Sequence, residues 1–82
     1  MQVCIQHIVT LTQSMTPQQS VSHLSGFYYM AQKSLFHAVG NGDEKEILYW
    51  SRYVRLVHQL ATSRSLAKDM MFQVAEMTKY RG

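Results

Sequence analysis

The chain has 82 residues, of which 46% are hydrophobic and 16% are charged, and its formal net charge is +3. This length suits one small domain, and the composition excludes a disordered chain, which would hold too few apolar residues to form a core. The Lys and Arg residues are scattered, which excludes the basic arm of many nucleic-acid-binding proteins, and the positive balance excludes an acidic DNA mimic. We therefore expect a single domain over residues 1–82.

The cysteine content and the hydropathy pattern bear on location. Cys4 is the single cysteine, so no disulfide can form within the chain, and a reducing compartment is favoured. No basic segment precedes an apolar stretch as in a secretory signal, and the apolar runs are much shorter than a membrane span. We expect a cytoplasmic protein with no membrane contact.

The apolar residues of the first segment, residues 1–14, fit both the period of a strand and the period of a helix. Four residues alternate with polar neighbours as in a strand, namely Val3, Ile5, Val9 and Leu11. Four residues also recur with helical spacing, namely Cys4, Ile8, Leu11 and Met15. A lone strand would leave its backbone groups unpaired, whereas a helix satisfies them internally. We expect a helix, and the alternative is a strand that pairs with its copy in a dimer.

The stretch "TPQQ" at residues 16–19 predicts the start of a long helix. Thr16 can cap it, Pro17 suits its first position, and Gln19 completes a capping box. Apolar residues then recur every three or four positions until Gly40-Asn41-Gly42, which is typical of a helix end. The pattern predicts a helix over about 17–39.

The stretch "DEKE" at residues 43–46 predicts a second helix, with Asp43 as its cap and Glu46 at the box position. Its apolar period runs in phase to residue 80. The alternative is a break near 62–65, "TSRS", with Ser65 capping a last helix, and both possibilities stay open. The predicted fold is all-α: a small helical bundle built on a hairpin of helices 17–39 and 43–80.

If the first segment is a strand, the order of the predicted elements resembles that of a known family of DNA-binding proteins. A strand followed by two helices in a dimer resembles the ribbon-helix-helix repressors, which implies that the paired strands read the major groove of DNA. The outward polar set of that strand would be Gln2, Gln6, Thr10 and Thr12.

The chemistry-bearing side chains form no recognisable site. His23 and His37 lie fourteen positions apart on one predicted helix, too far to share a metal ion. The carboxylates at residues 43–46 stand at a helix start, where capping explains them. We expect no catalytic residue, no metal site, no cofactor and no enzyme activity.

The segment "RYVRLVH" is the exception. Arg52 and His58 match an Arg-x(4–6)-His pattern that resembles the signature of HEPN-type ribonucleases. The resemblance implies a dimer in which His acts as a general base and Arg steadies the phosphate. A HEPN-like ribonuclease is the third functional hypothesis.

Three apolar segments predict an interface: "FYYM" at 27–30, "ILYW" at 47–50 and "MMF" at 70–72. Each places large side chains around much of the helix circumference, which requires neighbours on several sides. Because Tyr, Trp and Arg are frequent anchors of interfaces, we predict a partner-binding surface on the second helix. Its predicted residues are Tyr49, Trp50, Arg52, Tyr53 and Arg55.

These observations favour a small non-enzymatic adaptor, regulator or inhibitor that binds another protein and forms a homodimer. The alternative is a dimeric regulator that binds nucleic acid through Arg52 and Arg55.

Overall fold

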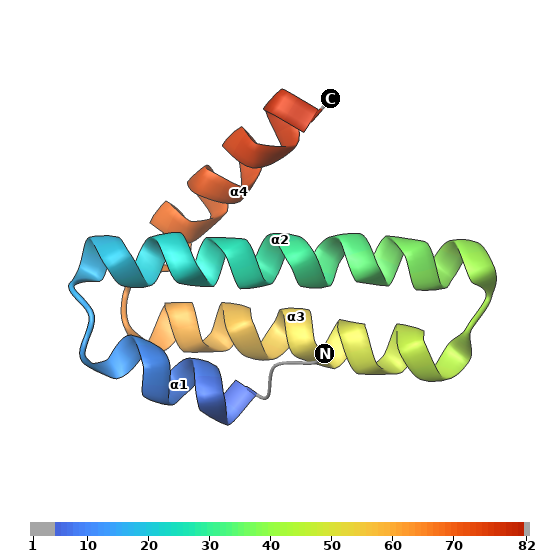
Figure 1. Cartoon of the computed structure of the whole chain (residues 1–82), viewed down its shortest axis with the longest axis horizontal. Coiled ribbons are helices and arrows are strands. Elements are labelled where there is room, and N and C mark those ends of the chain that lie inside the picture. Colours follow the sequence, from blue (N-terminus) through green and yellow to red (C-terminus); the bar gives the residue numbers. More distant parts are fainter. Residues whose placement is uncertain (1–4, 82) are drawn as a thin grey trace.

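A computed structural model describes residues 5–81, and these residues form four helices and no strand (Figure 1). The helices are α1 (Ile5–Gln13), α2 (Pro17–Asn41), α3 (Glu44–Ser63) and α4 (Ala67–Arg81). The predicted all-α fold is therefore confirmed. The first segment is helical over residues 5–13, which excludes the paired strand there. Residues 1–4, including Gln2, Val3 and Cys4, lie outside the described part of the chain.

Both ends of α2 have the local chemistry that the sequence predicts. The Thr16 hydroxyl accepts a hydrogen bond from the backbone amide of Gln19 at 3.2 Å, and the side-chain oxygen of Gln19 accepts one from the backbone amide of Thr16 at 3.1 Å. At the other end Gly42 adopts a left-handed conformation with φ +68°. The amides of Gly42 and Asp43 donate to the carbonyls of Val39 and Ala38, both at 3.1 Å. This closure ends α2 slightly beyond the predicted residue 39.

The second predicted helix is broken, so the continuous alternative is wrong. The Asp43 carboxylate caps α3 by accepting from the Glu46 amide at 3.2 Å. At the end of α3, Ser65 is left-handed with φ 60°, and its amide donates to the Thr62 carbonyl at 3.0 Å. The Leu66 amide donates to the Ala61 carbonyl at 2.8 Å. Ser65 thus ends α3, whereas the prediction made it the cap of the last helix.

Helices α2 and α3 run side by side as an antiparallel hairpin (Figure 1). Helix α1 lies along the C-terminal part of α3, and α4 projects away from the hairpin. The radius of gyration is 12.7 Å, above the roughly 11.7 Å typical of a compact chain of this length. The projecting α4 accounts for this open shape.

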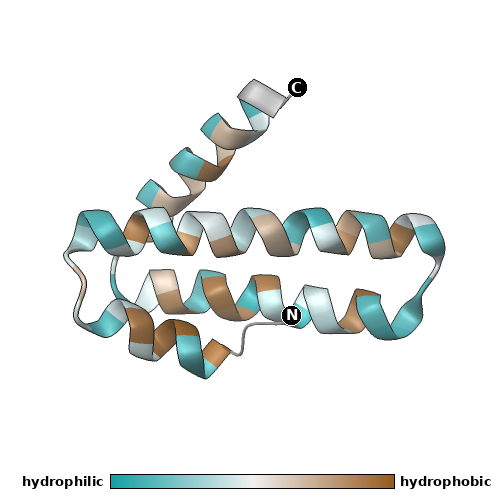
Figure 2. Ribbon diagram, in the orientation of Figure 1, coloured by the Kyte–Doolittle hydropathy of each residue, from teal (hydrophilic) through white to brown (hydrophobic). Residues whose placement is uncertain are grey.

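One cluster of buried side chains joins all four helices. Apolar and hydrophilic positions alternate along the helices (Figure 2), which is the pattern of amphipathic helices that bury one stripe. The buried members are Ile8, Leu24, Ala31, Tyr53, Val57, Ala61, Met70 and Val74. Between residues 5 and 81, no helix combines the length and the apolar character needed to cross a membrane.

Candidate partner-binding surface

The five predicted contact residues occupy three different environments. Tyr53 is only 4% exposed and belongs to the core. Tyr49 and Trp50 are half-buried and pack against that core. Arg52 and Arg55 are exposed. The fold therefore does not present these residues as one surface, and it withdraws Tyr53 from contact with any partner.

The three aromatic rings form a cluster that serves the fold of the hairpin. The Tyr49 and Trp50 ring centroids lie 4.9 Å apart in an edge-on arrangement, and those of Trp50 and Tyr53 lie 5.4 Å apart. Such distances are favourable for aromatic pairs. Because Tyr53 is buried in the core whereas Tyr49 and Trp50 are half-buried, the cluster extends from the core to the surface.

The surface of α3 that faces away from the core carries an exposed leucine between polar residues. We call this surface the outer face of α3, and it consists of Leu48, Arg52, Arg55 and Gln59. These residues follow one another at spacings of four, three and four, so they share one side of the helix. Leu48 is 72% exposed. Sequence reasoning missed Leu48, although its spacing from Arg52 and Arg55 would have placed it beside them.

The outer face of α3 is also basic, because two of its four residues are arginines. No Asp or Glu occurs between Glu46 and Asp69, whereas this stretch contains three arginines. Among the described residues, no hydrogen bond or ion pair involves the side chain of Arg52 or of Arg55. Both guanidinium groups are therefore free to bind an anionic group of another molecule.

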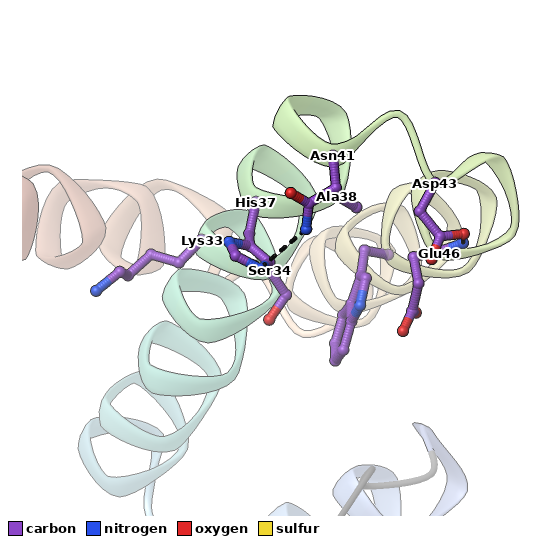
Figure 3. A pocket seen from close by; sticks show the side chains of 8 residues that line it. Lys33, Ser34, His37, Ala38, Asn41, Asp43 and Glu46 are labelled. Atoms are coloured by element: carbon purple, nitrogen blue, oxygen red, sulfur yellow. Dashed lines mark hydrogen bonds between the residues drawn. The ribbon is translucent and has the colours of Figure 1, made fainter.

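A cleft of about 520 Å³ lies next to Trp50, between the end of α2 and the start of α3 (Figure 3). On one side of the cleft, the side chains of His37 and Asn41 form a hydrogen bond with a nitrogen–nitrogen distance of 3.1 Å. Asp43 and Glu46 lie on the other side. Asp43 is already engaged as the cap of α3. Within the described residues, no group of three or more His, Cys, Asp or Glu side chains could hold a metal ion.

The other apolar segments divide between core and surface. In "FYYM" all four side chains are half-buried, and in "MMF" Met70 is fully buried. Phe72 is 68% exposed and lines a second cleft, of about 410 Å³, between the starts of α2 and α4. Near the end of α2, Phe36 is 64% exposed. Apolar surface thus remains uncovered on three helices, although most of the segments that predicted it serve the core.

The pair Arg52 and His58 is not brought together within one chain. Both residues are exposed on α3. Six positions on an α-helix separate two side chains by about 120° around the axis, so they point in different directions.

Comparison with known proteins gives no relative for this surface: no protein-family model, curated protein or solved structure matches the chain.

Proposed function

We propose that this chain is a small, non-enzymatic adaptor, regulator or inhibitor that binds another protein, and that it acts as a homodimer in the cytoplasm. The observation that supports this proposal is the outer face of α3, where an exposed Leu48 stands beside Arg52 and Arg55. Leu48 offers an apolar contact beside two guanidinium groups, and arginine is one of the residues that concentrate binding energy at interfaces.

The chemistry of the face indicates the chemistry of the partner. A guanidinium group forms paired hydrogen bonds with a carboxylate. No carboxylate among the described residues forms an ion pair with Arg52 or Arg55. Leu48 needs an apolar pocket or an apolar helix surface. The partner that fits is therefore a protein surface with an apolar centre and Asp or Glu side chains at its rim.

A capture experiment with matched variants tests this proposal. The double variant Arg52→Glu/Arg55→Glu should lose the protein that the parent chain retains from its host, with affinity at least about tenfold weaker. The control is Lys68→Glu/Lys79→Glu, which makes the same charge change at exposed positions of α4. Equal loss in both variants, or no loss in the first, would contradict the proposed surface.

Nucleic-acid binding is the second candidate, and the stretch without carboxylates between Glu46 and Asp69 favours it. Leu48→Ser separates the two candidates. It should weaken a protein complex, because the apolar contact is lost, and it should leave binding to phosphate groups unchanged. Retention on nucleic acid that falls steeply as salt rises, with no effect of Leu48→Ser, would support the second candidate.

A further inference from the structure

The ends of α2 and α3 have the same hydrogen-bond pattern but different residues at the left-handed position. In α2 this position is Gly42 with φ +68°, and in α3 it is Ser65 with φ 60°. Glycine adopts this conformation freely, whereas a residue with a Cβ atom is strained in it. The turn after α3 is therefore held in a less favourable conformation than the turn after α2.

The sequence around Ser65 does not itself require a turn. Residues 43–81 contain neither glycine nor proline. One seam of α3, formed by Tyr49, Tyr53, Leu56 and Leu60, continues at spacings of three and four through Ser63, Ala67 and Met70 to Val74. If residues 64–66 became helical, α3 and α4 would form one helix with this mainly apolar seam along it.

The contacts of α4 explain why the turn forms within one chain. α4 packs mainly against α2, where the Ser25 hydroxyl donates to the Met70 carbonyl at 3.4 Å. Met70 and Val74 are buried there. A straightened α3–α4 helix would carry these side chains away from α2 of its own chain. The surface that complements them is then α2 of a second copy.

We propose that two copies of this chain exchange α4, so that residues 64–66 become helical and α4 of each copy packs on α2 of the other. This inference rests on the homodimer in the proposed function and states how it assembles. The exchange rebuilds every contact between α2 and α4 across two chains. It also removes the strained conformation at both copies of Ser65, and an exchange of identical elements closes as a symmetric pair.

Two substitutions at Ser65 test the exchange in opposite directions. Ser65→Gly relaxes the left-handed turn and should favour the monomer, whereas Ser65→Ala favours the helix and should favour the dimer. Ser65 is exposed, so neither change disturbs the core. Light scattering across a concentration series should give a dissociation constant about tenfold or more lower for Ser65→Ala than for Ser65→Gly. Equal constants, or monomers throughout, would overturn the proposal.

A labelling experiment distinguishes exchange from a dimer formed by other surfaces. Isotope-labelled and unlabelled chains are unfolded, mixed and refolded, and nuclear Overhauser contacts between different chains are selected. Contacts between Ser25 and Met70 should then appear between chains. A dimer that shows them only within one chain overturns the exchange. Loss of partner capture in the Arg52→Glu/Arg55→Glu variant is a separate result, because that variant alters neither Ser65 nor the contact of α2 with α4.

Discussion

The guanidinium of Arg64, at the end of α3, donates a hydrogen bond to the Thr12 hydroxyl of α1, 52 positions earlier in the chain. It also donates to the Val9 carbonyl at 3.3 Å. The Thr12 hydroxyl donates in turn to the Ile8 carbonyl at 2.8 Å. Since α1 has no basic residue in its last turn, Arg64 supplies the positive charge that favours the C-terminal end of this helix.

Arg64→Gln should therefore release α1. We expect the free energy of unfolding to fall by about 2 kcal/mol, because a charged donor with two acceptors is lost at a partly buried position. Denaturant unfolding measures the loss, and amide hydrogen exchange should accelerate most in residues 5–13. Arg55→Gln is the control, since Arg55 is exposed, and it should change stability by less than about 0.5 kcal/mol. Equal losses in both variants would contradict this role.

Two glycines should respond to alanine in opposite directions. A Cβ atom at Gly26, an exposed position within α2, would meet nothing within 4 Å, so Gly26→Ala should stabilise the chain by about 0.5–1 kcal/mol. Gly42 also has open space, but its φ of +68° disfavours a Cβ atom, so Gly42→Ala should destabilise it by about 1 kcal/mol. Thermal unfolding of both variants measures the difference. A stabilising Gly42→Ala would show that the turn after α2 is not held in this conformation.

Truncation along α3 should distinguish core from surface. Tyr53→Ala removes a buried ring and should cost about 3–5 kcal/mol, which is enough to unfold so small a domain. Trp50→Ala removes a half-buried ring that contacts Tyr49 and Tyr53, and should cost about 2 kcal/mol. Leu48→Ala is the control at an exposed position, with a change below about 0.5 kcal/mol. Circular dichroism during urea unfolding gives all three values, and a Leu48→Ala loss as large as that of Tyr53→Ala would contradict the placement of the outer face.

The capping box before α2 offers a fourth test. Thr16→Ala should destabilise the chain by about 1 kcal/mol, because the Gln19 amide loses its acceptor. Gln19→Ala removes the reciprocal bond to the Thr16 amide. We expect the double variant to lose less than the two single variants together, since each bond helps to hold the other in place. Purely additive losses, measured by denaturant unfolding, would mean that the two bonds act independently.

Local chemistry was sufficient to predict the hairpin. The capping box at Thr16, the glycine turn at residues 40–42 and the acidic start at Asp43 act through hydrogen bonds between residues a few positions apart. Such signals can be read from neighbouring residues alone. For this reason the starts of α2 and α3 lie where the sequence predicts them.

Residues that are close together in the chain predict that it is helical, where the hairpin begins and turns, and which stretches are apolar. The remaining features depend on contacts between helices. The turn at Ser65 exists because α4 gains burial against α2, although the local sequence is compatible with a continuous helix. The packing of the helices also places Tyr53 in the core and Leu48 in solvent. Periodicity places residues on a side of a helix, but which sides are covered depends on the packing of helices that are distant in the sequence.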